Sequence, residues 1–204
     1  MAFEEYGTQD GSGFPYSNIY FIDTAKNTYA ATRVAVQIEK DNADETTARS
    51  RAAALAAVKL KKFGIVKGNT GKLVVSHLQT DLTFDDRSGD GGDGRVKFAE
   101  EVWSMHIEGD HELVLTPVKV KIKDCSVYDQ DPVMMELKLT DNAAKTSKFL
   151  QKDTSLPATR GCPNSYRIQD VYLYKGLVAV FMGVFTQGFE GPDMRFMAAV
   201  GQLK

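Results

Sequence analysis

The run Leu177-Val-Ala-Val-Phe-Met-Gly-Val-Phe185 (LVAVFMGVF) is the longest apolar stretch of the sequence. It is apolar at odd and even positions alike, so it predicts a β-strand that is covered on both faces, at the centre of a sheet. It has about half of the roughly 20 residues that a membrane-spanning helix needs. A turn at 187–193 follows it, and Met194–Val200 would return as a neighbouring antiparallel strand.

Segments on the N-terminal side of this run alternate between apolar and polar residues, which is typical of half-buried antiparallel strands. In Val118–Lys123 the aliphatic side chains would face one way and the lysines the other. Met135–Leu139 repeats the pattern, with Glu136 and Lys138 pointing outward. Three shorter bursts near the N-terminus predict an antiparallel meander: Phe3–Tyr6, Ile19–Ile22 and Arg33–Ile38.

The periodicity changes to that of a helix between Asp44 and Phe63 (DETTARSRAAALAAVKLKKF). Acidic residues begin this segment, lysines end it and Gly64 follows, an order that suits the helix dipole and C-terminal capping. One long amphipathic helix (about 44–63) beside largely antiparallel sheets predicts an α+β fold that is dominated by β-structure. The stripe expected to face the core consists of Ala52, Leu55, Ala56, Leu60 and Phe63.

The length of 204 residues fits a single domain over 1–204. Positive and negative side chains, 25 Lys and Arg against 27 Asp and Glu, give a net charge of -2 and are mixed along the chain. We therefore expect no nucleic-acid partner, no anionic membrane surface as partner and no membrane span. Met1 leads directly into a strand pattern, so no signal peptide is expected within this sequence.

Two clusters of potential metal ligands fail simple tests. Asp86–Gly94 resembles the first half of an EF-hand loop, but Lys97 stands at the twelfth position, where a bidentate carboxylate is needed; we expect a mobile loop there instead. His106 and His111 would lie on opposite faces of a hairpin. The sequence has no nucleophile, phosphate-loop or dinucleotide motif, so we predict no metal, no cofactor and no catalytic residue.

The connection Gln9–Asn18 (QDGSGFPYSN) is longer than a hairpin needs and combines glycine, proline and aromatic residues. Its rings could stack on a ligand, or they could fold back over the end of the sheet. The turn Thr186–Asp193 has a similar composition, and we expect both loops at the same end of the molecule, near Arg160. The candidate ligand-binding residues are Asp10, Phe14, Tyr16, Arg160, Phe189, Glu190, Asp193 and Arg195.

Three segments of the chain are distinctive: Phe3–Asp23, Arg160–Tyr172 and Val184–Phe196. They resemble signature segments of the DUF2259 family, which consists of bacterial predicted secreted proteins with no assigned function. The resemblance implies an exported protein, periplasmic or secreted, whose signal peptide is absent from this sequence. It implies no catalytic residues. In an oxidising compartment a disulfide between Cys125 and Cys162 is favoured, with two separate thiols as the alternative.

These observations favour a non-enzymatic binding or interaction module that presents loops 9–18, 158–166 and 186–195. Its ligand would be a small molecule or a protein of the cell envelope, and the sequence does not indicate which. One alternative is a hydrolase that uses the carboxylates of Asp10, Glu190 and Asp193 on a small polar ligand. Another is a structural envelope protein without a ligand.

Overall fold

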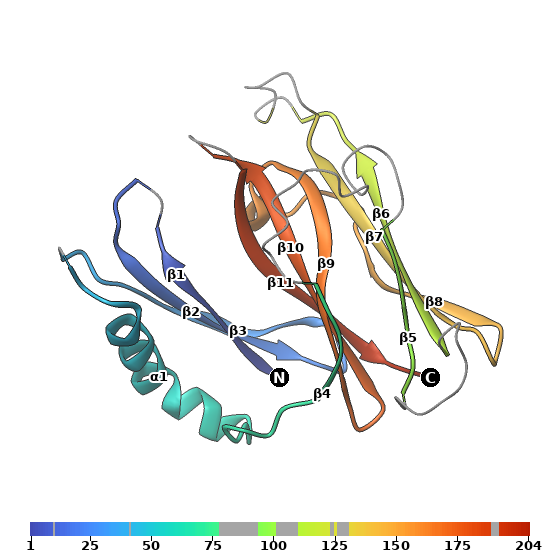
Figure 1. Ribbon diagram of the computed structural model, residues 1–204, viewed down its shortest axis with the longest axis horizontal. Coiled ribbons are helices and arrows are strands. Elements are labelled where there is room, and N and C mark those ends of the chain that lie inside the picture. Colours follow the sequence, from blue (N-terminus) through green and yellow to red (C-terminus); the bar gives the residue numbers. More distant parts are fainter. Residues whose placement is uncertain are drawn as a thin grey trace. The chain divides into compact units, whose positions relative to one another are not determined.

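The computed structural model describes residues 1–9, 11–40, 42–77, 94–100, 110–122, 125, 131–188 and 192–204. Three antiparallel sheets dominate it, with one α-helix in the described residues, so the α+β prediction is confirmed (Figure 1). The chain divides into two compact units, Met1–Thr70 and Gly71–Lys204. The single domain expected from the chain length stays a prediction. Within the described ranges, no helix has the length and apolar character to cross a membrane.

The first unit is an antiparallel meander packed against a helix. Its strands β1 (Ala2–Thr8), β2 (Pro15–Asp23) and β3 (Thr28–Gln37) lie in that order in the sheet, and α1 (Glu45–Lys62) follows. The helix begins where Oδ1 of Asp44 accepts a hydrogen bond of 2.7 Å from the amide of Thr47. This bond satisfies one of the amides that the first helical turn leaves without a partner. Meander and helix therefore form where the sequence predicts them.

The helix buries only part of the predicted stripe: Ala52, Ala56 and Leu60 pack in the core, whereas Leu55 and Phe63 are exposed. Ala48, Ala52 and Ala56 have no exposed surface, and the last two belong to the same core cluster as Phe21 of β2. Leu55 is 64% exposed, so its place in the predicted core stripe is wrong. Alanines four residues apart form a smooth ridge that lets the helix backbone approach the sheet closely. The helix is therefore oriented so that these alanines face the sheet and Leu55 faces away from it.

The second unit contains two four-stranded antiparallel sheets. One has the order β11-β10-β9-β4 and the other the order β5-β6-β7-β8. A short 3-10 helix, η2 (Ala158–Arg160), precedes β9. The strands are β4 (Lys72–Ser76), β5 (Gly94–Phe98), β6 (His111–Lys119), β7 (Val133–Asp141), β8 (Thr146–Lys152), β9 (Pro163–Tyr174), β10 (Leu177–Gln187) and β11 (Pro192–Gln202). The loop at Asp86 and the histidine at 106 lie outside the described residues.

The strand built from the apolar run, β10, is central as predicted, because it pairs with β9 on one side and β11 on the other. Its side chains Val180 and Met182 share one buried cluster with Met135 and Leu137 of β7. The two sheets of this unit therefore pack face to face as a sandwich. The alternation predicted around Met135 is confirmed, because Met135, Leu137 and Leu139 have almost no exposed surface.

The strand predicted at Val118–Lys123 is confirmed only for its first two residues, although half-buried aliphatic side chains do alternate with exposed lysines from Val118 to Ile122. β6 ends at Lys119, which pairs with Val133, the first residue of β7. The buried residues of β6 are Leu113 and Leu115. Since successive side chains point to opposite faces, Val118 lies on the face away from the core. The alternation of aliphatic residues and lysines continues after Lys119, whereas pairing with β7 ends there.

Two glycines of the second unit occupy crowded positions. A Cβ atom at Gly71 would lie 2.7 Å from the backbone oxygen of Leu173, and one at Gly201 would lie 2.7 Å from Cδ2 of Leu150. The backbone of β9 cannot yield without disturbing its pairing, whereas the end of a leucine side chain can rotate. The first position therefore requires glycine more strictly than the second.

Candidate binding site at one end of the second unit

Two of the three predicted loops, 158–166 and 186–195, lie at the same end of one sheet. Thr186 of β10 pairs with Pro163 of β9 on one side and with Asp193 of β11 on the other. The 3-10 helix that carries Arg160 leads directly into β9. Residues far apart in the sequence are thus brought to one sheet end by strand pairing.

Arg160 is paired with Asp153, which follows β8 directly. Nη2 of Arg160 donates a hydrogen bond of 3.0 Å to Oδ1 of Asp153, and Nη1 donates to Oδ2. The two side chains are 12% and 2% exposed, so this is a buried, bidentate ion pair. The sequence predicts that two loops lie near Arg160, but it does not indicate Asp153 as its partner. Nothing in the sequence distinguishes Asp153 from an exposed acidic residue.

Further hydrogen bonds complete the surroundings of this ion pair. The carboxylate of Asp153 also accepts from the amide of Met135 at 3.1 Å and from Nε2 of Gln151 at 2.7 Å. Nη1 of Arg160 lies 3.4 Å from the hydroxyl of Tyr166. Burial lowers the pKa of Arg160, but its hydrogen bonds to Asp153 and Tyr166 outweigh burial and raise that pKa above its ordinary value. Burial also raises the pKa of Tyr166.

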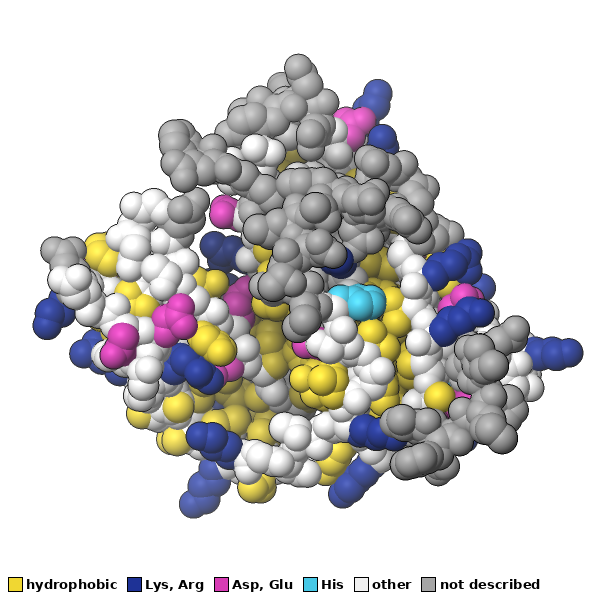
Figure 2. Space-filling model, viewed as in Figure 1, with side chains coloured by type: hydrophobic (Ala, Val, Ile, Leu, Met, Phe, Trp, Pro, Cys, Tyr) yellow, Lys and Arg dark blue, Asp and Glu magenta, His cyan; other side chains and the backbone are white. Residues whose placement is uncertain are grey.

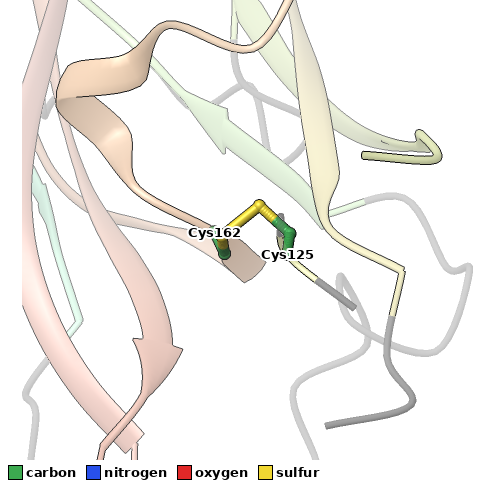
Figure 3. The surroundings of a disulfide bond; sticks show 2 residues. All are labelled: Cys125 and Cys162. Carbon is green, nitrogen blue, oxygen red and sulfur yellow. A yellow bond between two sulfur atoms is a disulfide. The ribbon is translucent and has the colours of Figure 1, made fainter. Parts of the chain in front are cut away.

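A disulfide ties the same loop to a second segment of the chain (Figure 3). Cys162 lies two residues after Arg160 and is bonded to Cys125, with a Cα–Cα distance of 5.4 Å. The covalent link and the buried ion pair hold the short segment from Arg160 to Pro163 at two points. Such a segment has little conformational freedom left to lose when it contacts a ligand.

The neighbouring β11 contributes exposed charges at this end. Asp193 and Arg195 are both exposed. Arg195 pairs with Val184, which pairs with Tyr166, so these three side chains lie on the same face of the sheet. Phe189 and Glu190 lie outside the described residues. The candidate site therefore combines a fixed loop with one exposed carboxylate and one exposed guanidinium.

The third predicted loop belongs to the first unit. The amide of Gln9 donates to the carbonyl of Phe14 at 2.9 Å, and the amide of Gly13 donates to the carbonyl of Gln9 at 3.0 Å, so the tip is held by its own backbone. Phe14 is half-buried. Tyr16 lies within β2, and its ring covers Gly7 of β1, where an added Cβ would be 3.4 Å from the tyrosine oxygen. Asp10 lies outside the described residues. A composite site of all three loops stays a prediction.

A second polar cluster surrounds His111. This side chain is 1% exposed, and its Nε2 lies 3.3 Å from Oε1 of Glu100, which is 3.2 Å from Nζ of Lys204. Burial raises the pKa of Glu100, but hydrogen bonds with Lys204 and His111 outweigh burial and lower it. Among the described residues, no three His, Cys, Asp or Glu side chains are grouped so that they could hold a metal ion. The cluster therefore ties the C-terminal residue to the second sheet of this unit.

These features define a β-rich protein with a meander-helix unit and a disulfide-linked β-sandwich unit. The chain belongs to the DUF2259 family, described as predicted secreted proteins, whose profile matches residues 2–202. The family match thus spans both units. No curated protein and no solved structure matches the chain.

Proposed function

We propose that the protein is exported to the periplasm or beyond the cell and acts there as a non-enzymatic binding module. The ligand would contact the end of the second unit formed by residues 158–166 and 186–195. The description of the family as secreted supports the location. The disulfide between Cys125 and Cys162 also suits an oxidising compartment.

The observation that carries this proposal is the double attachment of the loop around Arg160. A buried bidentate pair with Asp153 and a disulfide at Cys162 act within three residues of each other. Loops that are fixed before binding lose less conformational entropy when they bind, and this is the usual property of recognition loops on a rigid scaffold. The exposed charges of Asp193 and Arg195 at the same sheet end supply polar contacts.

A ligand would be sought by recording amide nuclear magnetic resonance spectra of the full chain while fractions of envelope small molecules and peptides are added. We expect the shifted amides to fall in 158–166 and 186–195. Arg195→Ala and Asp193→Ala should then weaken binding about ten-fold or more, because each removes a charge-assisted contact. Lys175→Ala, in the turn between β9 and β10 at the other end of the same sheet, is the matched control.

Shifts confined to other parts of the chain would contradict the proposed site. So would an equal loss of affinity in the Lys175→Ala control. Export is tested separately by adding protease to intact cells and to cells whose outer layer has been opened. Protection from protease in both preparations would place the protein inside the cytoplasm and contradict the location.

A further inference from the structure

Charge is balanced over the whole chain but not along it. Between Thr46 and His77, all of which is described, the sequence has no Asp or Glu. This stretch includes almost all of α1 and the segment that follows it. Its charged residues are Arg49, Arg51, Lys59, Lys61, Lys62, Lys67 and Lys72. The net charge of the whole chain conceals this basic stretch, so the expectation of no anionic membrane partner did not take it into account.

The outer face of α1 combines these cations with exposed aliphatic side chains. Leu55 is 64% exposed and Val58 is 78% exposed. Arg51 lies four residues before Leu55, and Lys62 lies four residues after Val58, so all four share one side of the helix. Lys61 is also exposed at the same end. We call Arg51, Leu55, Val58, Lys61 and Lys62 the helix patch.

The apolar part of this surface continues beyond the helix. Phe63 is 38% exposed and Val66 is 67% exposed, and Lys67 follows them. Figure 2 shows yellow hydrophobic and dark blue Lys and Arg side chains next to one another over the region of α1. Arg49 is not part of the patch, because it makes an ion pair of 2.9 Å with Glu4 and stacks on Tyr6.

We propose that the helix patch binds the surface of a lipid bilayer that contains anionic phospholipid. The guanidinium and ammonium groups of Arg51, Lys61 and Lys62 would contact lipid phosphates. Between them, Leu55 and Val58 would enter the boundary between headgroups and acyl chains. Long cationic side chains can follow an apolar surface with their methylene groups and keep their charges at the lipid headgroups. The protein would therefore lie on the membrane without spanning it.

Other occupants fit this face less well. Two copies that pack antiparallel through α1 would bring Arg51 of one copy towards Lys62 of the other, and like charges at such a distance repel. A nucleic acid would satisfy the cations but would leave Leu55 and Val58 without an apolar partner. A fluid bilayer supplies both phosphate and hydrocarbon to a convex helix, and needs no matching groove.

The inference concerns residues of the first unit and does not rest on the binding site proposed in the second. The test uses the full chain and vesicles of equal parts phosphatidylglycerol and phosphatidylcholine, with vesicles of phosphatidylcholine alone for comparison. Binding is measured by co-sedimentation at low salt and in about 0.5 M NaCl, where surface charges are strongly screened. We expect binding to the anionic vesicles, much weaker binding to the neutral ones and loss of most binding in high salt.

Three double variants examine the two parts of the patch. Lys61→Glu with Lys62→Glu should reduce partitioning by about five-fold for each charge removed or reversed, so by well over ten-fold in total. Leu55→Ser with Val58→Ser should reduce it by about ten-fold while leaving the salt dependence unchanged. Lys145→Glu with Lys175→Glu makes the same change in net charge at two turns of the second unit and should have little effect.

The proposal is overturned if the unchanged protein does not bind the anionic vesicles, or binds both kinds of vesicle equally. It is also overturned if the control variant weakens binding as much as the Lys61 and Lys62 variant does. Full binding by the Leu55 and Val58 variant, together with displacement from vesicles by a polyglutamate peptide, would indicate an acidic protein partner instead of a bilayer.

Discussion

Removing one partner of the ion pair between Arg160 and Asp153 should be among the most destabilising single changes in the second unit. Its side chains are 12% and 2% exposed, and Asp153 accepts further hydrogen bonds from Met135 and Gln151. Asp153→Asn keeps the shape and one acceptor oxygen but leaves the charge of Arg160 without its counterion. Arg160→Met leaves the carboxylate of Asp153 buried with neutral donors only.

The expected cost follows from these two situations. Removing one partner of a buried ion pair costs about 3–5 kcal/mol, because the remaining charge stays in poorly solvated surroundings. Water reaches Arg160 more easily than Asp153, so Asp153→Asn should cost about 3 kcal/mol and Arg160→Met about 4 kcal/mol. The double variant leaves no buried charge and should be no less stable than the worse single variant. The coupling energy should therefore be at least about 3 kcal/mol.

Guanidinium unfolding followed by far-ultraviolet circular dichroism, with the disulfide intact, measures this double-mutant cycle. The matched control is the pair Lys152 and Glu136 on the adjacent strands β8 and β7, which has a distance of 2.9 Å but side chains 52% and 29% exposed. Its coupling should be below about 1 kcal/mol. A coupling at Arg160 and Asp153 below about 0.5 kcal/mol, or no larger than that of the control, would refute the reasoning.

Alkylation without reductant should label neither Cys125 nor Cys162 in protein made in an oxidising compartment, and a label on either would contradict the disulfide. Replacing both by serine should cost about 4 kcal/mol, the chain-entropy value for their sequence separation of 37. The hydrogen bond from the helix amide lowers the pKa of Asp44 from its ordinary value of 3.8. The contribution of the ionised Asp44 carboxylate to folding stability is therefore present above pH 3.8 and is lost as the pH falls through the lowered pKa. Asp44→Ala should reduce the melting temperature at neutral pH, and this reduction should become smaller as the pH falls through the lowered pKa; a reduction that does not change with pH would exclude this explanation. Gly71→Ala should cost about 1–3 kcal/mol and Gly201→Ala less than about 1 kcal/mol in thermal unfolding, since only the former meets backbone; equal costs would show that the backbone there yields.

A strand could be predicted where its apolar pattern covers the same residues as its pairing with the neighbouring strand. The run at Leu177–Phe185 is a central strand, and the alternation around Met135 faces the core as expected. The alternation at Val118 continues beyond the start of the partner strand, so it does not report the core face. For the helix, the placement of Leu55 required knowing that three alanines would meet the sheet, which is a property of tertiary packing.

The surroundings of the candidate site residues could be predicted only in part, for related reasons. Strand pairing brings loops 158–166 and 186–195 together. The similar composition of loop 9–18 and the turn 186–193 suggested a different pairing, which stays a prediction because the two loops belong to separate units. The partner of Arg160 could not be found, because a buried carboxylate such as Asp153 looks like any surface acid until its burial is known. The basic stretch after Thr46 was present in the sequence, but a charge count over the whole chain averages it away.

The helix patch has a consequence for folding that separates it from an ordinary core helix. A helix that packs on a sheet normally turns its largest apolar residues inward, whereas α1 buries alanines and exposes Leu55 and Val58. Larger residues at the alanine positions would push the helix away from the sheet. The exposed pair, in contrast, is not required for that packing. Leu55→Ser with Val58→Ser should therefore change the free energy of unfolding by no more than about 0.5 kcal/mol for each residue, as for other surface positions. A loss above about 2 kcal/mol in total would mean that these side chains support the fold, and their exposure would no longer argue for a contact with lipid.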